Sequence, residues 1–170
     1  MRVERDYQVP PAKLFAVLTD EVFLAARSAR FGGSAPPTVR RNADTVVVTI
    51  PRQLPVESVP AAFRGFVGSG AVVQTETWFP AGDGSARGDW TSDAGNSPLE
   101  LSGSQEVTAT AGGCRYVVTA QVKVRIPFVG GRAEAMVRSQ LEDLVGKEQD
   151  FAAEWLARPS TAEAGGVAGR

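Results

Sequence analysis

The sequence predicts an α+β protein in which an antiparallel sheet of about six to seven strands wraps around one long C-terminal helix. Three observations support this prediction. Residues 131–158 contain no proline and one internal glycine, Gly146, and their apolar side chains recur at helical spacing. Residues 38–126 instead alternate apolar and polar side chains between turn residues. Because most of these turns are short, neighbouring strands are expected to pair antiparallel.

One strand and two short helices are expected before this sheet. Residues 1–9 alternate polar side chains with an apolar face formed by Met1, Val3, Tyr7 and Val9. Pro10 and Pro11 end that strand and open a short helix. A second short helix is predicted over residues 21–30, and the Gly32–Gly33 pair stops it.

The remaining strands are predicted from their period of two and from the turns between them. They cover residues 38–41, 45–54, 71–79, 85–93, 99–110 and 116–126. Gly82 and Gly84 fit a tight hairpin turn, because glycine adopts positive φ without a steric penalty. Residues 55–70 are irregular, apart from a helical turn that would expose Phe63 and Phe66 on one side.

The long helix carries one broad apolar stripe that must lie on the dry face of the sheet, in a helix-grip arrangement. Gln149 and several charged residues are predicted to lie off the stripe, whereas Glu148 falls near its middle and Gln140 inside its margin. These two polar interruptions suggest a cavity. The stripe comprises Ala133, Met136, Val137, Leu141, Leu144, Val145, Phe151, Ala152, Trp155 and Leu156.

Length and composition indicate one globular domain over residues 1–158, followed by a small, Gly-rich and disordered tail over residues 159–170. The 18 basic and 19 acidic side chains nearly cancel and form no basic run, which argues against nucleic acid and anionic membranes as partners. The absence of a signal peptide and of a long apolar segment predicts a cytoplasmic protein without stable membrane insertion. The sequence does not predict an oligomeric state.

The chain of 170 residues contains no histidine, and this excludes several classes of active site. Ser-His-Asp and Cys-His catalysis and zincin-type metal sites all need it. The single cysteine, Cys114, excludes an internal disulfide, and we expect it to be an inert buried thiol. No metal site and no cofactor are predicted. Any catalysis would rest on carboxylates, tyrosine, arginine or lysine.

The candidate ligand-binding residues come from the two surfaces that face each other across the expected cavity. The strand wall would be Val118, Ala120, Val122 and Val124, and the helix wall Val137, Leu141, Leu144 and Val145. Trp78, Trp90 and Tyr116 could stack on a flat ligand, although ordinary core packing is the favoured explanation, because bulky aromatics are normal strand residues. Glu148 and Gln140 are candidate polar anchors.

Each polar candidate has a more ordinary interpretation. Carboxylates are rarely fully buried, so Glu148 is expected at an exposed rim unless it is paired or faces a cavity. Gln140 would then reach solvent from the edge of the stripe. Arg52 and Gln105 are in phase with Ile50 and Val107 and could point inward, but their places near strand ends favour solvent exposure.

Certain short segments resemble the START-like (SRPBCC) superfamily. They are Phe31–Gly33, Thr75–Trp78 with the Asp83–Gly84 turn, Val122–Val124 running into Ile126–Gly131, and the late Trp155. The chain is similar in particular to an uncharacterised actinobacterial family within that superfamily. The resemblance covers residues 1–158 and implies a helix-grip fold with a hydrophobic cavity between sheet and helix. It implies no shared catalytic residue.

Three functional hypotheses remain open from the sequence. The leading one is binding of a small hydrophobic molecule, such as a lipid, polyketide or isoprenoid-like compound, in that cavity. An enzyme of the polyketide cyclase or aromatase type is the first alternative, and it requires converging titratable groups. A protein-interaction module is the second, and it requires a filled core and a large exposed apolar patch.

Overall fold

The computed structural model describes residues 1–54, 61, 64–65, 69–126 and 130–158. Its elements follow the predicted order. They are β1 (Arg2–Tyr7), α1 (Pro11–Leu18), α2 (Glu21–Arg30), β2 (Thr38–Arg41), β3 (Val46–Gln53), β4 (Ala71–Pro80), β5 (Ala86–Asp93), β6 (Leu99–Thr110), β7 (Gly113–Thr119), β8 (Gln121–Val124) and α4 (Gly130–Leu156). The predicted turn with Phe63 and Phe66 and the predicted tail at 159–170 lie outside the described residues.

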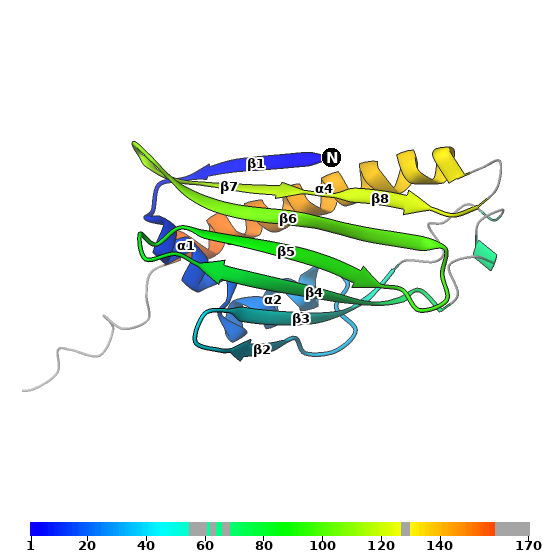
Figure 1. Cartoon of the computed structure of the whole chain (residues 1–170), viewed down its shortest axis with the longest axis horizontal. Coiled ribbons are helices and arrows are strands. Elements are labelled where there is room, and N and C mark those ends of the chain that lie inside the picture. The colour runs from blue at the N-terminus through cyan, green and yellow to red at the C-terminus, as the bar shows by residue number, and fades with distance from the viewer. Residues whose placement is uncertain (55–60, 62–63, 66–68, 127–129, 159–170) are drawn as a thin grey trace, which may run out of the picture.

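The strands form one antiparallel sheet in the order β1-β7-β6-β5-β4-β3-β2, with β8 paired to β6. Figure 1 shows α4 running along one face of this sheet, behind β1, β7 and β6, with α1 and α2 on the same side. The predicted fold class, a helix-grip with two short helices after the first strand, is therefore confirmed. Among the described helices, none is long and apolar enough to cross a bilayer.

Local sequence explains where several elements begin and turn. Pro11 occupies the first turn of α1, where its missing N–H is not needed. The side chain of Asp20 caps α2 by accepting a hydrogen bond from the backbone N–H of Phe23 at 2.8 Å. Of the two glycines in the β4–β5 hairpin, Gly84 has a positive φ of 84°. Gly82 does not adopt the positive φ that the sequence suggested for both.

The last predicted strand, 116–126, is divided into β7 and β8 at Ala120, although both pieces pair with β6 in one continuous register. The interruption coincides with Gly103 of β6. A Cβ at Gly103 would collide with the carbonyl oxygen of Thr119 and lie 2.6 Å from Nε1 of Trp90. That indole donates a hydrogen bond to the same carbonyl at 3.1 Å, so the carbonyl is turned out of the ladder toward Trp90.

Each of the two inward tryptophans lies over a glycine of the next strand. Trp78 of β4 is paired with Gly88 of β5, and a Cβ there would lie 3.1 Å from the indole ring. Trp90 of β5 is paired with Gly103 of β6 in the same way. A glycine inside a strand marks such a close approach. The glycines therefore make room for the two large indoles close to the backbone of the sheet.

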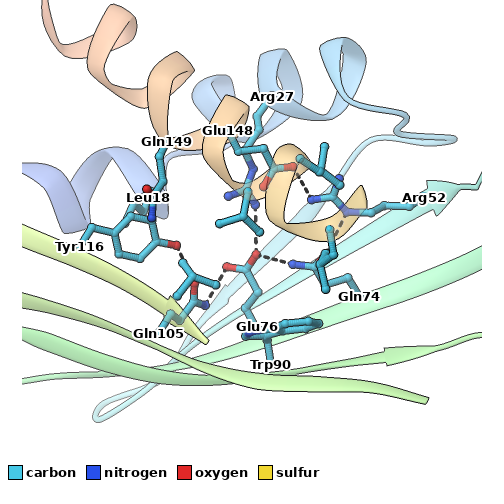
Figure 2. Close-up of a pocket in the computed structure, with 14 residues that line it drawn as sticks. Leu18, Arg27, Arg52, Gln74, Glu76, Trp90, Gln105, Tyr116, Glu148 and Gln149 are labelled. Atoms are coloured by element: carbon cyan, nitrogen blue, oxygen red, sulfur yellow. Dashed lines mark hydrogen bonds and ion pairs between the residues drawn. The ribbon is translucent and has the colours of Figure 1, made fainter. Parts of the chain in front are cut away.

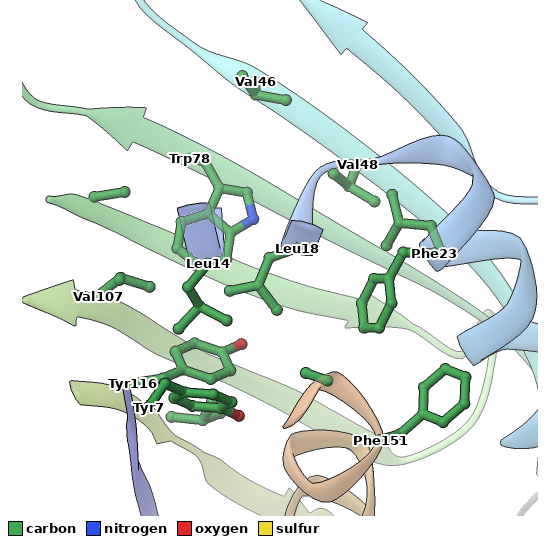
Figure 3. Packing of buried hydrophobic residues seen from close by; sticks show 14 of the residues in the cluster. Tyr7, Leu14, Leu18, Phe23, Val46, Val48, Trp78, Val107, Tyr116 and Phe151 are labelled. Atoms are coloured by element: carbon green, nitrogen blue, oxygen red, sulfur yellow. The ribbon is translucent and has the colours of Figure 1, made fainter. Parts of the chain in front are cut away.

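An apolar core fills one end of the space between the sheet and α4. Figure 3 shows Leu14, Leu18, Phe23 and Phe151 converging with the two buried tyrosines, Tyr7 and Tyr116. Phe23 and Phe151 stack with ring centroids 5.7 Å apart. Trp155 contacts both rings edge-on or at a tilt. This cluster fixes the last two turns of α4 against α2.

Two glycine substitutions test the packing in opposite directions. Gly103→Ala is expected to destabilise the fold by about 1–3 kcal/mol, because backbone atoms and the Trp90 indole must shift to admit a methyl group. Gly146→Ala, inside α4 with no atom within 4 Å of the added Cβ, is expected to stabilise it by about 0.5–1 kcal/mol. Urea unfolding measures both. A Gly103→Ala variant as stable as the parent would contradict the proposed packing.

Candidate functional site

A cavity of about 40 Å³ lies between the inner face of the sheet and the middle of α4 (Figure 2). Its apolar wall consists of Leu18, Trp90, Val118, Leu141, Leu144 and Val145. Its polar wall consists of Arg27, Arg52, Gln74, Glu76, Gln105, Tyr116, Glu148 and Gln149. The space is large enough for a few water molecules or a small polar group, and smaller than the roughly 300–1,000 Å³ of typical ligand pockets.

Glu76 of β4 is the centre of the polar wall. Alternation along β4 places it on the inner face with Trp78, and it is only 2% exposed. Oε1 accepts hydrogen bonds from Arg27 at 3.1 Å and from Gln74 at 2.9 Å. Oε2 accepts from the Trp78 indole and from Gln105, both at 3.2 Å. Four donors saturate this carboxylate.

Arg27 of α2 lies between two carboxylates. Its Nη2 donates to Glu76, and Figure 2 shows the guanidinium beside Glu148 as well. Burial disfavours the charged form, but Glu76 and Glu148 together hold the pKa of Arg27 above its ordinary value. Its position four residues after Phe23 on the buried face of α2 brings it to the sheet. Arg27 is therefore a permanent buried cation.

A second ion pair joins Arg52 of β3 to Glu148 of α4, with Nη2 and Oε1 2.7 Å apart. Nε of Arg52 donates to Gln74 at 2.9 Å, and Nη1 donates to the carbonyl of Phe31 at 3.2 Å. Burial opposes ionisation of Glu148, but the charges of Arg52 and Arg27 lower its pKa below the ordinary 4.5. Glu148 is thus ionised at neutral pH.

Tyr116 and Gln149 complete the wall near α1. The Tyr116 hydroxyl donates to Oε1 of Gln105 at 2.7 Å. Burial, followed by the charge of Glu76, raises the pKa of Tyr116 well above 10, so the phenol stays neutral. Gln149 is 3% exposed, and its Nε2 has no hydrogen-bond partner among the described residues. An unpaired buried amide is costly and therefore uncommon in proteins.

Several sequence-based expectations about polar residues are wrong. Glu148 is not at an exposed rim, since its side chain is 13% exposed and paired with Arg52. Arg52 and Gln105 are buried, at 7% and 4% exposure, because they continue the inward phase of β3 and β6. Gln149 does not lie off the apolar stripe: four residues after Val145, it shares the buried face of α4.

The structure brings some of the candidate ligand-binding residues to the cavity and leaves others away from it. Glu148, Leu141, Leu144, Val145, Val118, Trp90 and Tyr116 line the cavity. Trp78, Ala120 and Val122 are buried in the core, while Val137 and Val124 are half-buried, and none of the five is part of the cavity wall. Gln140 is exposed on α4 and is not part of the cavity wall, so it is not part of the proposed site.

Sequence reasoning missed Arg27, Gln74, Glu76, Gln149 and Leu18. The alternation of β4 could have identified Glu76 and Gln74, because they lie two and four residues before the inward-facing Trp78 and so share its face. Arg27 and Gln149 were detectable from helical spacing to Phe23 and Val145. Arg27, Gln74 and Glu76 were not considered as site residues, and Gln149 was predicted to lie off the apolar stripe.

Replacing Glu148 tests the second ion pair through pH. Glu148→Gln should lower the free energy of unfolding by about 3 kcal/mol near neutral pH, because the buried Arg52 loses its counter-ion. Folding lowers the pKa of Glu148 below 4.5. The stability that the ionised Glu148 contributes is therefore fully present above about pH 4.5, and it is lost as the pH falls through the lower pKa of the folded state. The difference between parent and variant should therefore shrink in acid.

Urea unfolding of both proteins between about pH 3 and pH 7 measures this difference. Glu142→Gln, at an exposed position of α4, is the matched control and should behave as the parent does. A Glu148→Gln deficit that stays constant down to the acid end of the range would show that the ion pair is not the cause.

Comparison with known proteins supports the fold and places the chain in a family. An uncharacterized protein of Mycobacterium tuberculosis, Rv0481c, is 33% identical over 88 residues, which are 51% of each chain. The chain thus matches the curated relatives over about half of their length. The crystal structure of TTHA0849 from Thermus thermophilus aligns with a TM-score of 0.61 at 18% identity, covering 91% of this chain and 94% of that one.

The crystal structure of the Zhui aromatase/cyclase from Streptomyces sp. R1128 aligns with a TM-score of 0.59 at 14% identity, covering 98% and 99% of the two chains. At such identities these neighbours establish the shared fold alone, and they confirm the predicted helix-grip fold. Residues 2–156 match the family model described as "Protein of unknown function (DUF2505)". The chain therefore belongs to the DUF2505 family.

Proposed function

We propose that the chain binds a small, mainly hydrophobic molecule carrying a polar group between the sheet and α4. The observation that carries the proposal is the mixed wall of the internal cavity. One side is apolar, with Trp90, Leu141 and Leu144. The other holds two ion pairs and the Gln149 amide, whose Nε2 has no partner in the described part of the chain. A few polar groups in an otherwise apolar concavity are typical of small-molecule sites.

The small volume indicates how such a molecule would be accommodated. About 40 Å³ admits a polar head but not a whole lipid or polyketide. Leu141 and Leu144 are half-buried, so their side chains can change rotamer without leaving a fully packed core. The ligand body would take the place that these two side chains now occupy, and the head would reach the polar wall.

A second candidate function, catalysis of the cyclase or aromatase type, is favoured by one observation. Arg27, Arg52, Glu76, Glu148 and Tyr116 converge on the cavity, as such an enzyme requires. The name of one structural neighbour, an aromatase/cyclase, is compatible with this hypothesis. However, the lowered pKa of Glu148 makes it a weak base, and the raised pKa of Tyr116 makes it a weak acid. Binding without turnover is therefore the better-supported function.

The interaction-module hypothesis has less support. It predicts a large exposed apolar patch, and the residues suggested for it, Phe63 and Phe66, lie outside the described residues. Among the described residues, the large hydrophobic side chains that are exposed belong to different parts of the surface: Val22 on α2, and Val73 and Phe79 on β4. A nearly filled core is the one feature of the described residues that agrees with this hypothesis.

A matched pair of tryptophan substitutions on α4 tests ligand binding. Leu144→Trp should fill the cavity from its apolar side and reduce binding of the fluorescent hydrophobe N-phenylnaphthylamine at least tenfold. Gln140→Trp, one helical turn earlier and exposed, should leave binding unchanged. Fluorescence titration measures both, and native mass spectrometry with solvent extraction identifies any molecule that copurifies.

Circular dichroism and thermal unfolding must show that both variants are folded. Absence of probe binding by the parent protein, together with an empty native mass, would contradict the proposal. Equal losses in the two variants would place the probe elsewhere on the helix.

A further inference from the structure

The donors and acceptors of the polar wall that are not yet engaged indicate which polar group a ligand should carry. This inference about the polar group rests on the proposed function. Glu76 is saturated by four donors, and the Gln105 and Gln74 side-chain oxygens are occupied by Tyr116 and Arg52. The acceptors of Glu76, Gln105 and Gln74 are therefore already engaged. Glu148, which accepts only from Arg52 among the described residues, is the most solvent-exposed of the four charged side chains.

The polar wall of the cavity also holds hydrogen-bond donors that are not engaged by the described residues. Nε2 of Gln149 has no partner among the described residues, although the residue is only 3% exposed. Arg27 makes one side-chain hydrogen bond within the described residues, through Nη2, so its Nη1 and Nε remain available to an occupant of the cavity. A guanidinium can only donate. The site thus requires an acceptor from its ligand.

The charges of the wall decide which kind of acceptor fits. Two guanidiniums, Arg27 and Arg52, face two carboxylates, Glu76 and Glu148, so the formal charge of the wall is zero. A ligand carboxylate would add a buried negative charge without a cation of its own, and that is strongly unfavourable. A neutral oxygen acceptor satisfies the free donors and leaves the charge balance intact.

We propose that the polar wall of the cavity recognises a neutral carbonyl oxygen, as in a ketone, ester or amide, through Gln149 and Arg27. Figure 2 shows the Gln149 side chain directed toward Leu18 and Tyr116, on the same side of the sheet as Arg27. The carbonyl lies between them at the base of the apolar wall. Ligands with a carboxylate or with no oxygen bind more weakly.

Three naphthalene derivatives with the same ring substitution test this assignment. They are naphthyl methyl ketone, naphthoate and ethylnaphthalene, and each is titrated into the full chain by displacement of N-phenylnaphthylamine at about pH 8, where naphthoate is ionised. The ketone should bind roughly tenfold more tightly than either of the others, because one hydrogen bond to an otherwise unsatisfied donor is gained. Equal binding of ketone and hydrocarbon, or tighter binding of naphthoate, would overturn the inference.

This design separates the two levels of the argument. If none of the three compounds binds and the fluorescent probe does not bind, the proposed function itself fails. If the hydrocarbon and the probe bind but the ketone has no advantage, the binding function stands and the carbonyl assignment fails.

The variant Gln149→Met tests the assigned residue and includes a readout that distinguishes a structural role. Methionine has a similar volume and removes a buried amide that has no partner among the described residues, so the fold should be as stable as the parent or more stable. The preference for ketone over hydrocarbon should nevertheless fall roughly tenfold. Gln140→Met, the same substitution at an exposed position, should change neither quantity.

An unchanged preference in Gln149→Met would remove this residue from the site. A parallel loss of ketone and hydrocarbon binding would show that Gln149 shapes the cavity without contacting the carbonyl, which also contradicts the assignment.

Discussion

A carboxylate on the inner face of a sheet needs a counter-charge and a donor for each lone pair, and Glu76 obtains these from three elements. Arg27 comes from α2, Gln105 from β6, and Gln74 and Trp78 from β4 itself. Because each donor must reach the same two oxygens, the position of α2 over the sheet is fixed to within hydrogen-bonding distance. That constraint helps to shape the cavity, since Arg27 and Gln105 are part of its polar wall.

The network is difficult to explain as a device for stability alone. Buried ion pairs usually contribute little, because desolvation offsets most of the attraction, and apolar residues of similar volume often serve better. Here two pairs lie beside an amide with no partner among the described residues, which is a cost that a purely structural core avoids. Natural proteins keep such local violations mainly at functional sites. The energetic cost of this network is therefore more typical of a functional site than of a purely structural core.

The spacing of apolar residues and the identity of the turn residues were sufficient to predict the fold but not the site. The bounds of α2, β2 and β6 and the long helix all follow from patterns of neighbouring residues. The site depends on pairs far apart in the sequence, such as Arg52 with Glu148, and no local pattern reports them. The general expectation that polar residues are exposed then misled the prediction, because Arg52 and Gln105 were in phase with a buried face and were still expected in solvent. Their burial shows that the phase of the strand was the better guide.

The way α4 is attached indicates where the cavity can enlarge. Near its start, Glu134 accepts a hydrogen bond from the backbone of Val124 at 2.9 Å. Near its end, Phe151 and Trp155 are held in the aromatic cluster with Phe23. Between these two anchors the apolar side chains on α4 up to Leu144 are only half-buried or exposed. Displacing them gives up less apolar burial than displacing the end of the helix, because the lost free energy scales with buried area. We therefore expect a ligand larger than the present cavity to be accommodated at the middle of α4, next to Arg27 and Arg52.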